Sequence, residues 1–237
     1  EGAGLGIQFL NALVLRVLVP AGAVGIAVWY ADQGIGWLQV RATPGTILIS
    51  ALLLDLAIYL QHVVSHKLPL FWRLHRMHHS DTHIDATTAL RFHPVEIVVS
   101  MGWKAVVLAV LGAPPVAVLI FEVLLNSSAV FNHANLRLPS WLDTPLRRVL
   151  VTPDMHRVHH STLPGEHHNN FGFSLSVWDR WFGTYVAQPR DGHLHMHIGL
   201  SEFQRERPES LGWCLTIPFR TAQNPTAATP GVTPAVS

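Results

Sequence analysis

Hydrophobic residues run through this chain in long stretches instead of the short alternations typical of a soluble domain. Apolar runs extend from Leu5 to Val28, from Thr46 to Val64 and from Pro94 to Val130, with an interruption at residues 112–115 in the last one. About 20 apolar residues are enough to cross the hydrocarbon core of a bilayer. The pattern therefore predicts an all-α integral membrane protein. Its four expected transmembrane helices are Leu5–Val28, Pro44–His66, Pro94–Leu111 and Pro115–Phe131.

Composition agrees with a membrane-embedded chain. Charged residues occupy 13% of the 237 positions, against roughly 25% in ordinary soluble domains. A formal net charge of +1 argues against a nucleic-acid partner. The single cysteine, Cys214, excludes an intrachain disulfide, a cysteine-based zinc site and an iron–sulfur cluster. The first apolar run lacks a basic leading segment and a small-residue cleavage motif, so it predicts a span and not a signal peptide.

The distribution of basic residues predicts how the chain is oriented in the membrane. Basic residues cluster after the second and fourth spans, whereas the loop from Trp29 to Thr43 has one Asp and one Arg. By the positive-inside tendency, both clusters and both chain termini should face the cytoplasm. We expect a single domain over residues 1–220, in which segments 67–93 and 132–220 form a cytosolic helical cap. The tail, residues 221–237, is rich in Ala, Thr and Pro and is expected to be disordered.

Two copies of one six-residue phrase lie in the predicted cap. They are His75-Arg76-Met77-His78-His79-Ser80 and His156-Arg157-Val158-His159-His160-Ser161. On a helix, positions i, i+3 and i+4 share a face, so each phrase projects three imidazoles in one direction. Imidazoles gathered this densely repel one another when protonated, and a bound cation is the natural reason to collect them.

Three further histidines reach the same membrane face. His62 and His66 end the second span one helical turn apart, and His133 closes the fourth. A single metal ion takes four to six ligands, so nine histidines fit two metals better than one. Imidazole suits zinc, copper, nickel and iron alike, and two irons that activate O2 beside a lipid-facing cavity explain the set most directly. The expected ligands are His62, His66, His75, His78, His79, His133, His156, His159 and His160.

Other polar residues near these histidines are candidates for supporting roles. His93 opens the third span at the same level and is a candidate additional ligand, or else it only starts the helix and bonds Glu96. Ligating histidines usually pass their second ring N–H to a carboxylate or carbonyl. The acidic residues that are candidates for that role are Asp81, Asp85, Asp154 and Asp179. The alternative for each is a helix cap or an ion pair with an arginine, such as Asp179 with Arg180. The histidines expected to lie in solvated loops, without a metal, are His83, His167, His168, His193, His195 and His197.

Three charged residues lie within the predicted spans at a common distance from the histidine level. Asp55 precedes His66 by eleven residues, Lys104 follows His93 by eleven, and Glu122 precedes His133 by eleven. Eleven residues are about three helical turns, or roughly 16 Å of rise. Ions inside a membrane usually face the bundle interior and pair with one another. We therefore expect a buried layer of Asp55, Lys104 and Glu122 beneath the metal site, which either fixes helix packing or lines a substrate cavity.

The spacing of these histidines resembles that of the fatty acid hydroxylase / sterol desaturase superfamily of membrane di-iron oxygenases. The resemblance rests on H-x-x-x-H at His62 and His66 and on H-x-x-H-H at residues 75–79 and 156–160, and it covers roughly Leu54 to Leu200. The supporting phrases are Arg91-Phe92-His93-Pro94-Val95-Glu96, Asn132-His133-Ala134-Asn135 and Trp178-Asp179-Arg180-Trp181-Phe182-Gly183-Thr184.

This resemblance implies a di-iron centre held by the histidines of these three motifs and by His133. Zinc is a possible substitute acquired during expression. The resemblance also implies O2 as a co-substrate and the hydroxylation or desaturation of a C–H bond of a membrane lipid, such as a sterol or a fatty acyl chain. Electrons would come from a separate donor protein. Two rival classes remain open. They are a histidine-rich membrane metal-binding or transport protein, which should place ligands near the bilayer midplane, and a b-type cytochrome.

Overall fold

The computed structural model describes residues 2–37, 39, 41–204, 206 and 210–221. These residues form helices joined by loops, and their strand-like pairing is limited to two isolated bridges, Leu150 with Leu175 and Ser161 with Ile198. The all-helical fold class is thus confirmed. Apart from Thr221, the tail that the sequence predicts to be disordered lies outside the described residues.

The long helices match the predicted spans in number and position. Four segments are long and apolar enough to cross a membrane, and at most 39% of any of their most hydrophobic windows is buried by the protein itself. Side chains such as Phe9, Leu48, Val106 and Leu124 are exposed on their surfaces, as expected for helices that face lipid. The segments are Leu5–Asp32, Pro44–Lys67, Pro94–Leu111 and Pro115–His133.

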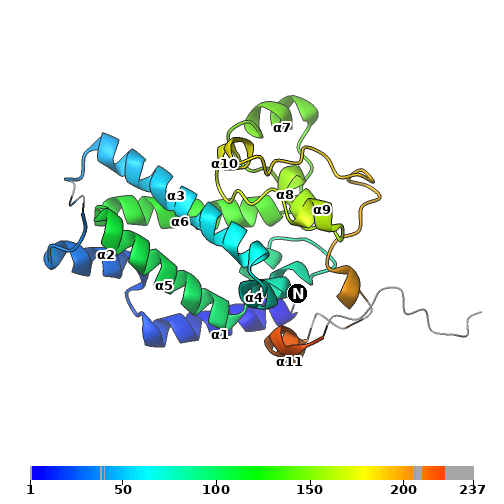
Figure 1. Ribbon diagram of the computed structural model, residues 1–237, viewed down its shortest axis with the longest axis horizontal. Helices are drawn as coiled ribbons and strands as arrows, with labels where there is room; N and C mark the ends of the chain where they lie inside the picture. The colour runs from blue at the N-terminus through cyan, green and yellow to red at the C-terminus, as the bar shows by residue number, and fades with distance from the viewer. Residues whose placement is uncertain (1, 38, 40, 205, 207–209, 222–237) are drawn as a thin grey trace, which may run out of the picture.

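The first span differs from the uninterrupted helix that the sequence predicts. It consists of α1 (Gly2–Leu18) and α2 (Gly22–Asp32), which are separated by a short break at Pro20. Proline has no backbone N–H and its ring clashes with the preceding turn, so it ends a helix at this point. Gly22 then adopts a positive φ of 60° at the start of α2. Both α1 and α2 pack against α5 on either side of this break (Figure 1).

Proline also fixes the starts of the other long helices. α3 (Pro44–Lys67), α5 (Pro94–Leu111) and α6 (Pro115–His133) each begin with a proline, at a position where the missing N–H costs nothing. Thr43 and Thr46 form a capping box before α3. α5 ends at Gly112 in the left-handed conformation, where a side chain would collide with Gln39.

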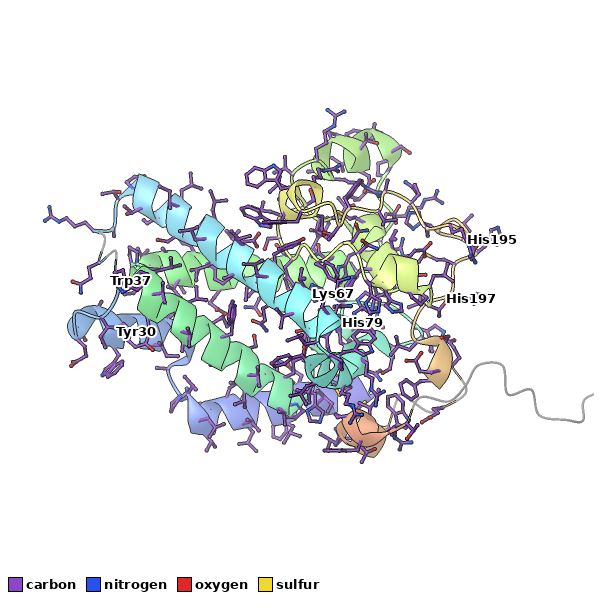
Figure 2. All side chains as sticks on the ribbon, in the orientation of Figure 1. Tyr30, Trp37, Lys67, His79, His195 and His197 are labelled. Atoms are coloured by element: carbon purple, nitrogen blue, oxygen red, sulfur yellow. The ribbon has the colours of Figure 1, made fainter. Side chains whose placement is uncertain are left out.

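Shorter helices gather beyond one end of the long ones, as Figure 1 shows. α4 (Pro69–His79) follows α3 directly, because Leu68 is extended before Pro69 and reverses the chain. Figure 2 places Lys67 and His79 at this end and Tyr30 and Trp37 at the opposite end. The remaining elements are η1 (Thr88–Leu90), α7 (Ser140–Leu146), α8 (Pro153–His159), α9 (Pro164–His167), α10 (Val177–Trp181), η2 (Ser201–Phe203), α11 (Leu211–Thr216) and η3 (Ile217–Phe219).

One buried apolar cluster holds the spans together, and another connects the first span with the short helices. One lies among α2, α3, α5 and α6 and includes Leu54, Leu108 and Phe121. The other joins Ile7 of α1 and Met77 of α4 to residues of α11 and η3. Burial of this apolar surface stabilises the arrangement. It holds α4 and the C-terminal helices against the ends of the spans, where the predicted histidines lie.

Candidate metal centre

The turn between α3 and α4 brings the first two histidine motifs together. His62 and His66 end α3, and α4 folds back so that the rings of His66 and His79 lie 4.7 Å apart, centroid to centroid. α8 packs against α6 and brings the third motif to the same place, where the rings of His66 and His159 are also 4.7 Å apart. Segments far apart in the sequence therefore converge on one buried site.

The nine predicted ligands form two groups, and within each group the nearest ring nitrogens of all members lie within 4.8 Å of one another. Every member is buried. The five-histidine group is His62, His66, His75, His79 and His159. The four-histidine group is His78, His133, His156 and His160.

Each H-x-x-H-H phrase is divided between the two groups. In α4, His75 and His79 point into the five-histidine group, and His78 points into the four-histidine group. In α8 the division is reversed, because His156 and His160 belong to the four-histidine group and His159 to the other. Around the helix axis, residue i+4 lies about 40° to one side of residue i, whereas i+3 lies about 60° to the other side. Two phrases that face each other thus build two adjacent pockets of imidazole.

Hydrogen bonds determine which nitrogen of several rings carries the proton. Nδ1 of His62 donates to the carbonyl oxygen of Phe171 (2.8 Å), and Nδ1 of His159 donates to that of Asn169 (2.7 Å). Nδ1 of His75 donates to Oε1 of Glu96 (2.6 Å). In a neutral imidazole the other nitrogen, Nε2, then presents a lone pair.

These lone pairs meet inside the five-histidine group. Nε2 of His62 lies 3.1 Å from Nε2 of His75 and 3.1 Å from Nε2 of His159. Three facing lone pairs repel one another unless a cation lies between them. Nε2 is also the nitrogen that commonly binds a metal when Nδ1 is held by a carbonyl or carboxylate. The donor set therefore fits a metal ion that binds imidazole.

The four-histidine group has a similar arrangement. Nδ1 of His133 donates to the carbonyl of Ala129 (2.8 Å), so its Nε2 presents a lone pair. That Nε2 lies 3.1 Å from Nε2 of His78 and 2.9 Å from Nε2 of His156. Among the described residues, Nδ1 of His78, His156 and His160 has no hydrogen-bond partner although each is buried. Buried polar atoms without partners are unusual. The Nε2 atoms are the ones that converge, because Nε2 of His160 also lies 3.2 Å from Nε2 of His156, and the position between them is suited to a second cation.

Burial keeps five histidines of the two H-x-x-H-H motifs neutral, as metal ligation requires. Removal from water, reinforced by the neighbouring imidazoles, lowers the pKa of His78, His79, His156, His159 and His160 well below that of a free imidazole. His79 is the extreme case, because it has no exposed surface and neither of its ring nitrogens has a hydrogen-bond partner within the described part of the chain.

The arginines of the two phrases point away from the histidine groups and hold the surrounding structure. Arg76 donates to the carbonyls of Ile217 (2.5 Å) and Arg220 (2.6 Å), which fastens η3 to α4. Arg157 forms an ion pair with Asp154 in its own helix. The arginine of each motif therefore stabilises the surrounding structure, and the histidines of the motif face the interior.

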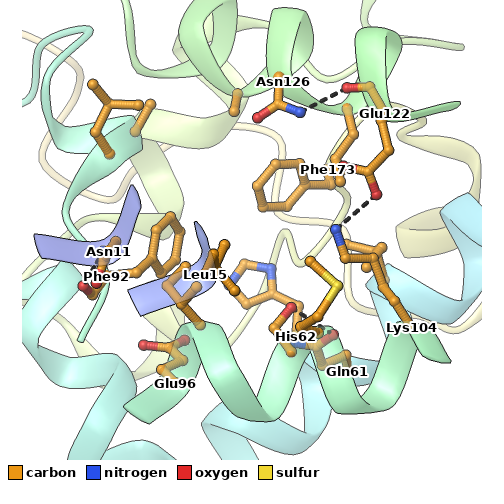
Figure 3. Close-up of a pocket in the computed structure, with 18 of the residues that line it drawn as sticks. Asn11, Leu15, Gln61, His62, Phe92, Glu96, Lys104, Glu122, Asn126 and Phe173 are labelled. Atoms are coloured by element: carbon orange, nitrogen blue, oxygen red, sulfur yellow. Dashed lines mark hydrogen bonds and ion pairs between the residues drawn. The ribbon is translucent and has the colours of Figure 1, made fainter. Parts of the chain in front are cut away.

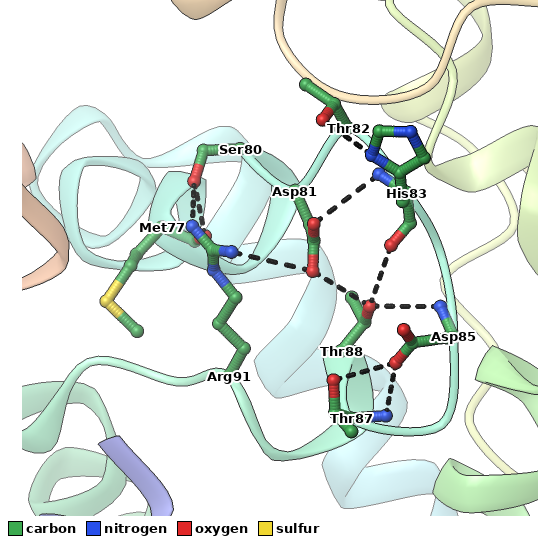
Figure 4. A network of polar contacts seen from close by, with 9 residues as sticks. All are labelled: Met77, Ser80, Asp81, Thr82, His83, Asp85, Thr87, Thr88 and Arg91. Atoms are coloured by element: carbon green, nitrogen blue, oxygen red, sulfur yellow. Dashed lines mark hydrogen bonds and ion pairs between the residues drawn. The ribbon is translucent and has the colours of Figure 1, made fainter. Parts of the chain in front are cut away.

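The four candidate aspartates form no hydrogen bond with a predicted ligand among the described residues. They bond instead to arginines, a threonine hydroxyl or backbone N–H groups. Asp81 pairs with Arg91 (3.5 Å), and Asp85 accepts from Thr87 (2.7 Å) in the same polar network (Figure 4). Asp154 pairs with Arg157. Asp179 accepts from the backbone N–H groups of Phe171 (2.8 Å) and Gly172 (2.7 Å).

Asp179 nevertheless acts on the site through the backbone. It has no exposed surface, and burial raises its pKa to about 6 although three groups donate to it. The residue it holds, Phe171, is the one whose carbonyl orients His62. The carboxylate that contacts a predicted ligand directly is Glu96, which sequence reasoning named only as a partner for His93. Its position in the first turn of α5, within the phrase that begins at Arg91, was the available signal.

The remaining histidines separate into near and distant positions. His93 accepts from the N–H of Val95 (3.2 Å) and contacts the carbonyl of Leu215 (3.3 Å), so it caps α5 and lies outside both groups. Nδ1 of His168 lies 3.3 Å from Nδ1 of His66, and the ring of His167 stacks on Trp72. These two are therefore packed beside the five-histidine group and not in a solvated loop. His83, which bonds Thr82, is exposed, as are His195 and His197, which lie at the outer edge in Figure 2. His193, in the same segment after α10, is partly buried, and neither of its ring nitrogens has a hydrogen-bond partner among the described residues.

The charged residues of the spans do not form a three-membered layer. Lys104 and Glu122 form an ion pair (2.7 Å). Asp55 instead accepts a hydrogen bond from Nε1 of Trp178 (2.8 Å), which ties α10 to α3. Equal helical distances therefore predicted the pair across the α5–α6 hairpin, but Asp55 lies on another helix with a closer partner.

A cavity of about 280 Å³ extends between the five-histidine group and the Lys104–Glu122 pair. In Figure 3, Asn11 and Glu96 lie on one side of the cavity, Lys104 and Glu122 on the other, and His62 between them; His75 also lines it. Apolar side chains of α1, α3, α5 and α6 form the wall between them, together with Phe173. A cavity that passes from spanning helices to a buried imidazole cluster can hold a lipid segment beside a bound metal.

Comparison with known proteins agrees with this geometry. An ornithine lipid hydroxylase of Rhizobium tropici is 27% identical over 152 residues, which are 64% of this chain and 45% of the relative. Alkylglycerol monooxygenases of Xenopus tropicalis and Homo sapiens are 31% and 30% identical over 153 residues, which are 62% of this chain and 32% of each relative. The chain thus spans less than half the length of these relatives. No solved structure matches it.

The family comparison covers the part of the chain that carries the site. Residues 47–184 match the sequence profile described as fatty acid hydroxylase. The matched range runs from the start of α3 through α10 and includes all nine histidines of the two groups. More than half of the sequence is matched, and the chain belongs to the fatty acid hydroxylase family.

Proposed function

We propose that this chain is a membrane di-iron enzyme that uses O2 to hydroxylate a C–H bond of a lipid. The observation that carries the proposal is the convergence of nine buried histidines in two groups, one of which forms the end wall of a cavity among the spanning helices. The relatives are named as a lipid hydroxylase and as monooxygenases, which favours hydroxylation over desaturation. A sterol or a fatty acyl lipid from the bilayer is the proposed substrate class.

The histidines of each group would hold one iron ion. Two iron ions bound in this way supply the activation of O2 that is needed to break an unreactive C–H bond. The chain contributes the rest. His62, His75 and His159 are oriented by hydrogen bonds at Nδ1, the surrounding helices exclude water, and the cavity wall positions the substrate next to His62 and His75. A separate protein would deliver electrons.

Sidedness and domain organisation belong to the same proposal. We infer that the histidine groups, the short helices and both termini face the cytoplasm, because Lys67, Arg73, Arg137 and Arg148 lie at that end of the spans. We also propose that residues 1–220 act as one domain, since α1 packs against α5 and α11 and so connects the start of the chain with its last helices. A metal transporter would need ligands near the bilayer midplane, where this chain instead has the Lys104–Glu122 pair.

Metal analysis and two matched variants test the proposal. Purified protein loaded anaerobically with ferrous iron should bind two metal ions per chain and show no haem absorption. His159→Ala removes a ligand from the five-histidine group and His78→Ala removes one from the other. Each should lower product formation about 100-fold or more, because ligand loss disrupts a metal site at least as strongly as loss of a supporting residue. Product would be measured as lipid that has gained one oxygen atom in cells expressing each variant.

His195→Ala is the matched control, since this histidine is exposed and lies outside both groups. It should retain two metals and full product formation. A single metal per chain, bound haem, or unchanged product in either His159→Ala or His78→Ala would contradict the proposal. Zinc found after expression is not decisive by itself, because zinc binds such ligands more tightly than ferrous iron.

A further inference from the structure

The four-residue segment that follows α9, residues 168–171, contacts three members of the five-histidine group. Two of these contacts come from the main chain, through the carbonyl oxygens of Asn169 and Phe171. The third comes from a side chain, because Nδ1 of His168 lies 3.3 Å from Nδ1 of His66. One short segment therefore supports predicted ligands that belong to two different helices, α3 and α8.

The middle of this segment is anchored by Asn170. Its φ of 54° lies in the left-handed region, which Asn tolerates better than most residues. The side chain is fully buried. Its Nδ2 donates to the carbonyl oxygens of Met155 (3.0 Å) and Val186 (2.8 Å), and its Oδ1 accepts from the N–H of Val186 (2.8 Å). Since Met155 belongs to α8, these bonds hold the segment against the helix that carries the second H-x-x-H-H motif.

Aromatic packing holds the ring of His168 in place. Its centroid lies 5.3 Å from that of Trp72, in α4, and 4.3 Å from that of His167. Trp72 also packs against His66, with 4.9 Å between the ring centroids. His66 is buried, whereas His168 is partly exposed. His168 thus connects the surface of the protein with a predicted ligand inside it.

The direction of the hydrogen bond follows from the second nitrogen of His66. Nε2 of His66 is buried and has no hydrogen-bond partner among the described residues. A neutral imidazole carries one ring proton. If Nδ1 of His66 accepted from His168, Nε2 would carry that proton and could not bind a metal. If Nδ1 donates to His168, the lone pair of Nε2 is free to bind one, as it is in His75, whose Nδ1 donates to Glu96.

We propose that His168 is a positioning residue of the five-histidine group. Its Nδ1 accepts a hydrogen bond from Nδ1 of His66 and so keeps the Nε2 lone pair of His66 available for the metal ion. The inference rests on the proposed metal centre and deepens it, because it adds a residue that contacts a ligand and not the ion. The proton of the His168 ring is then on its own Nε2.

Two substitutions at this position separate the hydrogen bond from simple packing. His168→Asn keeps an acceptor, because the amide oxygen of Asn can take the place of the imidazole Nδ1, whereas His168→Leu offers none. Each protein is loaded with zinc and dialysed against increasing concentrations of a chelator, and the zinc retained per chain is measured. His168→Leu should lose one ion at a chelator concentration about 10-fold lower than wild type. The other ion in this variant, and both ions in His168→Asn, should be lost at concentrations close to those of wild type.

His195→Leu is the matched control, since it makes the same substitution at an exposed histidine outside both groups. It should lose both ions as wild type does. Three results with His168→Leu would overturn the inference: an unchanged release of both ions, an equal shift of both ions, or a shift that His168→Asn reproduces in full. The last two would indicate a general loss of packing and not the loss of one acceptor.

NMR of the wild-type protein decides the inference even if a variant fails to fold. In zinc-loaded protein labelled with 15N at histidine, the ring nitrogen shifts report which nitrogen carries a proton and which binds zinc. His66 should have a protonated Nδ1 and a zinc-bound Nε2, and His168 an unprotonated Nδ1. Zinc bound at Nδ1 of His66, or a proton on Nδ1 of His168, would contradict the proposed bond.

Failure of the proposed function would give a different result. Protein with two irons and a reductant would then oxidise no lipid, although zinc release would still depend on residue 168 in the manner described.

Discussion

Glu96 offers the sharpest test of how the chain prepares its metal site. Its carboxylate accepts a hydrogen bond of 2.6 Å from Nδ1 of His75, and both side chains are buried. The bond directs the Nε2 lone pair of His75 towards the other members of the five-histidine group. Replacing Glu96 with Gln keeps the shape and one acceptor oxygen but removes the charge. Replacing it with Leu removes the hydrogen bond altogether.

The expected size of the effect follows from the type of bond. A hydrogen bond to a charged group contributes about 1.5–3 kcal/mol and a neutral one about 0.5–1.5 kcal/mol. Glu96→Gln should therefore cost about 1–1.5 kcal/mol of metal binding, or roughly a tenfold loss of affinity. Glu96→Leu leaves Nδ1 of His75 unpaired and should approach the 100-fold loss typical of a missing supporting residue. Within the described part of the chain, Glu96 makes no hydrogen bond to a member of the four-histidine group, so this group should keep its affinity for metal.

Metal content under graded chelation measures this difference. Each protein is dialysed against increasing concentrations of a chelator, and the metal retained per chain is determined by mass spectrometry. Wild-type protein should lose each of its two ions at a characteristic chelator concentration. The Glu96 variants should lose one ion at a lower chelator concentration than wild type and the other ion at the same concentration. Asp143→Asn is the control, because this carboxylate is equally buried but pairs with Arg147 (2.5 Å) and makes no hydrogen bond or ion pair with a histidine among the described residues. Identical release curves for wild type and Glu96→Leu would refute the role assigned to Glu96.

Two further substitutions test the structure around the site. Lys104 and Glu122 are only partly buried, so Lys104→Met, which leaves Glu122 unpaired within a span, should cost about 1.5–3 kcal/mol. The double variant Lys104→Met, Glu122→Leu should be much closer to wild type. Thermal unfolding in detergent compares them, and equal losses would contradict a stabilising ion pair. Asp179→Asn presents one acceptor oxygen to three donors and should cost about 2–4 kcal/mol. The same unfolding assay checks it against Asp191→Asn, whose exposed carboxylate pairs only with its neighbour Arg190 among the described residues, and a stable Asp179→Asn variant would show that the acceptor is dispensable.

The location of the site could be predicted because its signal is local and repeated. Hydropathy defines the spans over about 20 residues at a time, and helical spacing places the imidazoles of each motif on one face. The ends of α3 and α6 then bring His66 and His133 to the same level as the two phrases. None of this reasoning requires knowledge of how the helices pack.

The division of each phrase between two groups could not be predicted in this way. It depends on the rotation of α4 relative to α8, which is set by contacts such as those of Met77 with α11 and η3. The expected aspartates illustrate the same limit. Asp81 and Asp154 lie close to the motifs in sequence, but nearby arginines are better partners for them. Proximity along the chain could only suggest candidate acidic residues. The packing of the helices determines which of them forms a hydrogen bond with an imidazole.

The sequence does not indicate which backbone carbonyls contact the site, yet three of them determine which ring nitrogen carries the proton in three predicted ligands. Phe171, Asn169 and Ala129 orient His62, His159 and His133, and each acts through its main chain. The carbonyl of Phe171 is itself held in place by Asp179, which binds the N–H of the same residue. An apparently remote carboxylate thereby fixes the Nε2 lone pair of His62 against those of His75 and His159. This arrangement is electrostatically costly without a cation and favourable with one, so folding of the segment around residue 171 and metal binding must stabilise each other.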